Sequence, residues 1–170
     1  MHVERLSPAH DLARFCCGNK TLDDWLRHHG WENDRRDLSR SYVLIDEPAT
    51  VVGYYSLTMG GVRKDRLPKR YGRGLPNYDI GMVLIARLAI SSSHQGQGLG
   101  RDLMIDAIKR SERAGANAAA RFLAVDPIDD AARAFYQRFG FRNIGGDPGG
   151  RMYLRLDEAT ALVDQRGERR

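Results

Sequence analysis

The apolar positions of the chain predict alternating strands and helices. Leu22, Trp25, Leu26 and His29 recur at helical spacing, and Thr21 with Asp24 resembles a capping box at the start of that helix. The polar stretch 32–40 is predicted to continue the helix and end it. Apolar or β-branched runs predict strands at 41–45, 51–59, 82–90, 121–125, 141–144 and 152–156. Further helices are predicted at 99–114, with Gly115 as C-cap, and from a cap at Asp129 to Arg138. This order indicates a mixed α/β domain.

A glycine-rich turn joins the strand at 82–90 to the helix that follows it. Gln95-Gly96-Gln97-Gly98-Leu99-Gly100 lies where the strand pattern changes into the helix pattern. Glycines let a backbone approach an anion closely, and the free N–H groups of a helix start point toward it. The spacing is not that of the dinucleotide motif, and no lysine of the phosphate-loop type follows. The turn is therefore a candidate pyrophosphate site, with a tight strand-to-helix connection as the alternative.

Composition narrows the class of protein. The 170 residues are 42% hydrophobic and 29% charged, which suits one globular domain over 1–170, with 157–170 as a C-terminal helix or tail. The longest apolar run, 82–86, is far shorter than the ~20 residues of a membrane helix. No secretory signal pattern is found, and the adjacent Cys16 and Cys17 make neither a disulfide framework nor a metal site by themselves. We expect a cytoplasmic protein without a metal.

The positive charge is concentrated in one segment. Residues 61–78 contain six basic residues and one acid, so they account for the whole net charge of +5. An anionic partner that docks there and a solvated loop explain this cluster equally well.

Two motifs together resemble the GNAT N-acetyltransferases. Gln95-x-x-Gly98-x-Gly100 is similar to the family's acetyl-coenzyme A motif, and 134–141 is similar to its late helix, in which a tyrosine lies beside the coenzyme sulfur. The N-terminal stretch 15–26, with 53–57 and 87–90, is similar to the acetyltransferase toxins of bacterial toxin–antitoxin pairs. The resemblance covers about residues 4–156, and 91–94 departs from the usual toxin pattern. It implies a central, mostly antiparallel sheet flanked by helices, with splayed middle strands that hold acetyl-CoA.

The resemblance also implies which residues bind the coenzyme. The backbone of the strand end would pair with the pantetheine arm, and the glycine-rich turn would hold the pyrophosphate. Residues at the late helix would border the coenzyme or, in the case of Arg138, reach its phosphates. The residues of the strand end are Leu88, Ala89 and Ile90. Those of the turn are Gln95, Gly96, Gln97, Gly98, Leu99, Gly100 and Arg101. Those at the late helix are Asp129, Phe135 and Arg138. For Arg138, a solvated helix face is an equal alternative.

Tyr136 is the candidate general acid. A thiol has a pKa near 8.5 and a tyrosine near 10, so the hydroxyl could protonate the leaving thiolate. The alternative is a core aromatic, but Phe135 and Phe139 are four residues apart and form the better core pair. No strong general base is evident, although Asp126 at a strand end could accept a proton or cap the next helix. An α-amine, with a pKa near 8, needs less help than a lysine, which favours an α-amine acceptor.

The resemblance implies that the acceptor is aminoacyl-tRNA, whose acetylation blocks translation. Lys69, Arg70 and Arg87 are our candidates for contacts to the tRNA acceptor stem, since phosphate contacts use arginine and lysine. Tyr54, Tyr55 and Tyr71 could stack on a base, with core packing at least as probable for each.

The resemblance further implies protein partners. These are a ribbon-helix-helix antitoxin, operator DNA bound only through the antitoxin complex, and a second copy in a homodimer. Two other functions stay open: a housekeeping acetyltransferase that acts on a small amine or a protein N-terminus, and a nucleic-acid-binding module that does not catalyse. We expect no membrane association.

Overall fold

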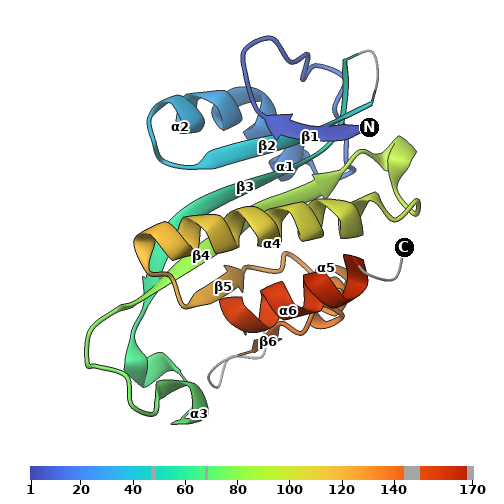
Figure 1. Ribbon diagram of the computed structural model, residues 1–170. Helices are drawn as coiled ribbons and strands as arrows, with labels where there is room; N and C mark the ends of the chain where they lie inside the picture. Colours follow the sequence, from blue (N-terminus) through green and yellow to red (C-terminus); the bar gives the residue numbers. More distant parts are fainter. Residues whose placement is uncertain (47–48, 68, 144–149, 168–170) are drawn as a thin grey trace. The chain divides into compact units, whose positions relative to one another are not determined.

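The computed structural model describes residues 1–46, 49–67, 69–143 and 150–167. One seven-stranded sheet runs through it in the order β1-β2-β3-β4-β5-β7-β6 (Figure 1). The strands are β1 (His2–Arg5), β2 (Arg40–Asp46), β3 (Thr50–Val62), β4 (Ile80–Ile90), β5 (Phe122–Val125), β6 (Arg142–Asn143) and β7 (Met152–Arg155). The β1–β2, β2–β3, β5–β7 and β6–β7 pairs are antiparallel. The predicted fold class, a mostly antiparallel sheet with helices, is confirmed.

The helices include short 3-10 and π-helical turns. They are α1 (Lys20–Trp25), a π-helical turn (Leu26–Gly30), α2 (Trp31–Arg35), 3-10 turns at Lys64–Arg66 and Ser92–His94, α3 (Lys69–Gly72), α4 (Leu99–Ala118), α5 (Asp130–Gln137) and α6 (Leu156–Gly167). None of the described helices is long and apolar enough to cross a lipid bilayer.

The chain divides into two compact units. The first unit comprises Met1–Thr58 and Ile85–Ala107, and the second comprises Met59–Leu84 and Ile108–Arg170. Strands β3 and β4 and helix α4 each contribute residues to both units. The single domain expected from the sequence stays a prediction.

Tyr54 lies at the centre of the first unit's core. Its ring is fully buried, stacks on Trp25 at a centroid distance of 6.1 Å and meets the edge of Phe15 at 5.4 Å. Its hydroxyl donates to the carbonyl of Leu22 at 2.9 Å. The remaining members of this cluster are Leu6, Leu26, Val43, Ile45, Val51 and Ala89. These contacts fasten α1 and the segment before it to the sheet.

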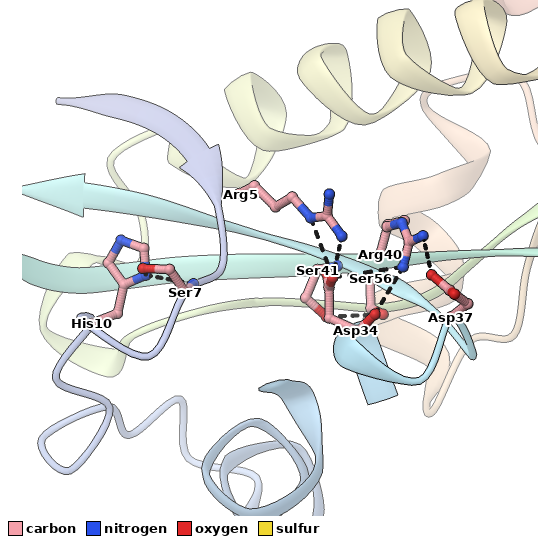
Figure 2. A network of polar contacts seen from close by, with 8 residues as sticks. All are labelled: Arg5, Ser7, His10, Asp34, Asp37, Arg40, Ser41 and Ser56. Carbon is pink, nitrogen blue, oxygen red and sulfur yellow. Dashed lines mark hydrogen bonds and ion pairs between the residues drawn. The ribbon is translucent and has the colours of Figure 1, made fainter. Parts of the chain in front are cut away.

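A buried carboxylate joins α2 to the first two strands. Asp34 is 1% exposed, and its carboxylate accepts from the Nε of Arg5 at 3.2 Å and from the backbone N–H of Ser41 at 2.9 Å (Figure 2). Arg40 donates to the Asp34 backbone carbonyl at 2.8 Å and also pairs with Asp37. Because a buried charge is tolerated only when it is paired, this network fixes α2 against the sheet.

The second unit is built on β5. Phe122 and Ala124 of this strand pack with Val62, Leu67, Ile80 and Met82 in its core. Helix α6 packs against β5 and β7. Gly115 of α4 lies so close to Leu156 that an added Cβ would collide with the Leu156 Cδ2 atom.

Several predicted boundaries were wrong. The cap of α1 is Asn19, whose side chain accepts from the backbone of Thr21 and Leu22, while Asp24 pairs with Lys20. The π-helical turn shifts the helical register, which leaves His29 exposed instead of on the apolar face. Helix α4 continues through Gly115 and ends before Ala119, which has φ +55°. Strand β1 was not predicted, and parts of the turns at 46–49 and 145–150 lie outside the described residues.

Candidate functional site

The glycine-rich turn presents its backbone to an open face of the first unit. Strand β4 ends at Ile90, a 3-10 turn follows, and α4 begins at Leu99. Gly96 has φ +77° and Gly98 has φ +82°, conformations that residues with a Cβ rarely adopt. Apart from the adjoining residues, no atom of the described part of the chain lies within 4 Å of the position a Cβ would take at either glycine. A ligand can therefore reach the backbone directly.

The turn offers unpaired backbone donors. In the described part of the chain, the amides of Gly98, Leu99 and Gly100 find no backbone acceptor, while the Gly98 carbonyl accepts from Arg101 at 2.9 Å and Asp102 at 3.3 Å. These amides begin a helix of 20 residues, whose dipole places partial positive charge at the same end. This arrangement fits a pyrophosphate.

The Gln95 side chain bonds to the backbone of its own chain, although the residue is exposed. Its amide nitrogen donates to the carbonyl of Cys17 at 2.9 Å and to the carbonyl of Ile90 at 3.0 Å. The chain itself uses the side-chain donors of Gln95, and the coenzyme-binding role that the resemblance implies for this residue stays a prediction.

The end of β4 is pressed closely against β3. Ala89 is buried, and Leu88 and Ile90 are half-buried. A Cβ at Gly53 of β3 would lie 2.7 Å from the Ile90 Cδ1 atom and 3.2 Å from the Ala89 carbonyl oxygen. Sequence reasoning gave Gly53 no role of its own, although an isolated glycine in a strand is the signal for such a close approach.

Arg87 is a half-buried cation on β4. Its guanidinium carbon lies 4.0 Å from the centre of the Trp25 ring, a cation–π geometry. Desolvation lowers the pKa of Arg87 from its ordinary value. No carboxylate among the described residues forms an ion pair with this side chain. The site therefore suits an external anion. Trp25 holds the guanidinium, a role that sequence reasoning missed.

Tyr136 lies in the second unit, on α5. It is 7% exposed, and its ring packs against Phe135 at 5.3 Å and Phe141 at 5.7 Å. Burial, with a smaller effect from the carboxylates of Asp126 and Asp129, raises the pKa of Tyr136 to about 12. No described residue hydrogen-bonds its hydroxyl. The group is thus a protonated donor without an internal acceptor.

The surroundings of Tyr136 correct two sequence expectations. Asp126 caps no helix and forms a bidentate ion pair with Arg151, with both distances 2.7 Å. The rings of Phe135 and Phe139 do contact each other, with their centres 5.2 Å apart. Phe135 is only half-buried, however, and Tyr136 is more deeply buried than Phe135.

The two ends of α5 agree better with the predictions made from the sequence. Asp129 caps the helix, as predicted, by accepting from the Ala132 N–H at 2.7 Å. Arg138 is exposed, with its guanidinium 6.0 Å from the Phe135 ring centre.

The basic segment of the second unit presents exposed cations. Lys69 and Arg70 are exposed on the short helix α3, and Arg70 stacks on Tyr71 at 4.5 Å. A hollow of about 550 Å³ is lined by Lys64, Asp65, Leu67, Lys69, Gly72, Arg73 and Asn77. Tyr71 is half-buried and its ring meets Phe122 edge-on at 6.1 Å.

Comparison with known proteins identifies the family of this chain. Residues 7–141 match the model of the Acetyltransferase (GNAT) family. The chain belongs to this family. A tRNA-acetylating toxin of Mycobacterium tuberculosis (strain ATCC 25618 / H37Rv) is 37% identical to it over 94% of each protein.

Solved structures of other GNAT proteins are also similar. AtaT complexed with acetyl-methionyl-tRNAfMet is 28% identical, with a TM-score of 0.87 over 95% of this chain and 98% of that one. A tyrosine-to-phenylalanine mutant of the AtaT toxin, bound to the C-terminus of the antitoxin AtaR and acetyl-CoA, is 26% identical, with a TM-score of 0.81 over 96% and 98%. The AtaT–AtaR complex bound to DNA is 28% identical, with a TM-score of 0.77 over 95% and 99%.

Within this GNAT protein, each unit assembles part of the predicted site. The first unit brings together Arg87, the strand end at 88–90 and the turn at 95–101. The second unit contains Lys69 and Arg70 on α3 and the coenzyme and acid candidates on α5. Tyr54 and Tyr55 are fully buried, so the core-packing alternative describes both rings.

Proposed function

We propose that this protein transfers the acetyl group of acetyl-CoA to the α-amine of aminoacyl-tRNA and thereby blocks translation. The observation that carries the proposal is the open glycine-rich turn, with unpaired amides at the start of α4, in a GNAT chain 37% identical to a tRNA-acetylating toxin.

The chain's own residues fit the coenzyme. The amides of Gly98, Leu99 and Gly100 would hold the pyrophosphate, and the backbone of 88–90 would pair with the pantetheine arm. Asp129, Phe135 and Arg138 would border the coenzyme. Acetyl-CoA supplies an acetyl thioester, an activated acyl donor.

Tyr136 would supply the proton that the departing thiolate needs. The ordinary pKa of a tyrosine is near 10. The raised pKa of about 12 keeps the hydroxyl protonated throughout the physiological range. It also makes the hydroxyl a weaker acid in the free enzyme, so the proton transfer relies on the thiolate developing charge beside it. The acceptor α-amine, with a pKa near 8, is about one-tenth unprotonated at pH 7, so it needs no strong base.

The acceptor tRNA would be held by cations. Lys69 and Arg70 are exposed and suited to backbone phosphates, and Arg87 offers a guanidinium oriented by Trp25 that has no counter-ion among the described residues. Phosphate contacts carry no sequence information, so choice of the aminoacyl group would depend on the pocket shape.

The partners follow from the same proposal. A ribbon-helix-helix antitoxin would neutralise the toxin, and operator DNA would be bound through the antitoxin complex. Solved relatives bound to an antitoxin C-terminus and to DNA support this part. We further propose a homodimer that acts in the cytoplasm, where charged tRNA is found.

A panel of acceptors tests the proposal. Purified protein with acetyl-CoA is offered charged tRNA, free amino-acid esters, small amines and peptides with a free N-terminus, and initial rates are compared. The proposal requires charged tRNA to have the highest kcat/KM by a wide margin. A small amine or peptide as the best substrate would favour the housekeeping acetyltransferase instead.

A further inference from the structure

The loop Cys16–Asn19, here called the support loop, touches the coenzyme turn at several points. The Cys17 carbonyl accepts from the Gln95 amide nitrogen at 2.9 Å. The Cys16 carbonyl accepts from the Ser92 N–H at 2.8 Å and from the Ser91 hydroxyl at 3.3 Å. Each contact joins the support loop to the segment between β4 and α4.

The support loop is itself fixed to α1. The Cys17 N–H donates at 2.8 Å to the carboxylate of Asp23, which is 5% exposed, and Asn19 caps the helix. Gly18 has φ +88°, and a Cβ there would lie 3.5 Å from the Ser92 hydroxyl oxygen. A continuous chain of hydrogen bonds therefore leads from α1 to the turn.

Gln95 closes this chain from the side of the turn. Both contacts of its amide nitrogen are made with carbonyls, one on the support loop and one on Ile90 at the end of β4. A primary amide has two N–H groups, so these two contacts use its full donor capacity. The side chain has no donor left for an anion.

We infer that Gln95 is a positioning residue whose side chain locks the glycine-rich turn to the support loop and to β4. The backbone amides bind the pyrophosphate, and Gln95 keeps these amides in the geometry that binding requires. This inference rests on the proposed use of acetyl-CoA. It gives the cysteine-containing stretch before α1 a function that does not involve thiol chemistry.

The variant Gln95→Met tests the lock, because methionine has a similar length and no donor. Hydrogen–deuterium exchange of the coenzyme-free protein should become faster at 95–101, while β2 and β5 keep their wild-type exchange. Calorimetry should find coenzyme A bound about tenfold more weakly, since two hydrogen bonds are lost. Turnover of S-acetylpantetheine, which lacks the pyrophosphate, should fall less than turnover of acetyl-CoA, because it does not use the amides of the turn. Gln137→Met, at an exposed glutamine of α5, is the matched control.

A second variant, Gly18→Ala, changes the support loop, which is the other partner in the lock. Gly18→Ala strains the support loop without touching the turn's amides, and it should produce the same exchange and binding pattern. Because both changes break the same lock, the double variant should bind coenzyme A no more weakly than the single variant with the lower affinity for coenzyme A. Additive losses would mean that Gln95 acts independently of the support loop, which overturns the inference.

The results separate two kinds of failure. Unchanged exchange at 95–101 in Gln95→Met, with or without weaker coenzyme binding, contradicts the lock. A wild-type protein that does not bind coenzyme A contradicts the proposed function, while the exchange comparison still decides whether Gln95 orders the turn.

Discussion

The glycine-rich turn of the first unit and helix α5 of the second unit offer different chemical groups, the backbone in one case and a side chain in the other. The turn offers backbone amides, and its glycines serve by having no side chain (φ +77° at Gly96 and +82° at Gly98). Helix α5 offers one hydroxyl, that of Tyr136, inside an aromatic cluster. The difference teaches that substitutions in the turn should change ligand binding, whereas substitution at Tyr136 should change the catalytic rate.

The largest effect is expected from Tyr136→Phe. Loss of a general acid lowers kcat by about 100-fold or more, while coenzyme A affinity stays within about twofold because the ring still packs. Steady-state kinetics and calorimetry measure the two quantities. Tyr153→Phe is the control, since Tyr153 is a second tyrosine of the second unit and is half-buried. A Tyr136→Phe enzyme with wild-type kcat would remove the contrast between the two regions.

A second test concerns the binding of the acceptor tRNA by residues that belong neither to the glycine-rich turn nor to helix α5. The double variant Lys69→Glu, Arg70→Glu should lower kcat/KM for charged tRNA by about 30-fold near 0.1 M salt, because two phosphate contacts are lost. The slope of log kcat/KM against log salt should become shallower by about 2. The same variant should acetylate a small amine at the wild-type rate. An unchanged salt slope would mean that these cations do not contact tRNA.

A third test concerns the backbone of the turn. Gly98→Ala places a Cβ on a residue with φ +82°, which costs about 1–2 kcal/mol, so coenzyme A should bind about tenfold more weakly. Gly74→Ala introduces similar strain at φ +75°, also in open space, and should leave coenzyme affinity unchanged. Equal effects from both variants would show general destabilisation instead of a binding role.

The smallest expected effect is on the shape of the pH profile of kcat/KM. Because the pKa of Tyr136 is raised to about 12, the acid form persists well above pH 10. The pH profile of kcat/KM should therefore rise through about 8 as the α-amine loses its proton and stay level to about 10.5. Initial rates across this range measure it. A descending limb near 10 would show that the hydroxyl titrates at its ordinary pKa.

The turn could be predicted from the sequence because its geometry is local. Glycines between a strand pattern and a helix pattern specify positive φ and free amides without information from the rest of the chain. The predicted cap at Asp129 was right for the same reason. The capping box at Thr21 was wrong because the helix begins earlier: Asn19, two residues before Thr21, accepts from the backbone N–H groups of Thr21 and Leu22.

The remaining features depend on contacts between distant residues. The raised pKa of Tyr136 comes from enclosure by residues of the folded second unit, which no local pattern encodes. Gly115 looked like a helix end, but packing against Leu156, distant in sequence, explains it. The Gln95 amide meets the Cys17 carbonyl across 78 positions of sequence, so this contact could not be read from the motif.

The most direct test of the central claim is mass spectrometry of a charged tRNA pool incubated with acetyl-CoA and either wild-type protein or Tyr136→Phe. The account predicts N-acetylated aminoacyl groups on specific tRNAs with the wild type and a loss of about 100-fold or more in their rate of formation with the variant. Bound coenzyme without any acetylated aminoacyl-tRNA would contradict the proposed function. Equal product from both proteins would contradict the role of Tyr136.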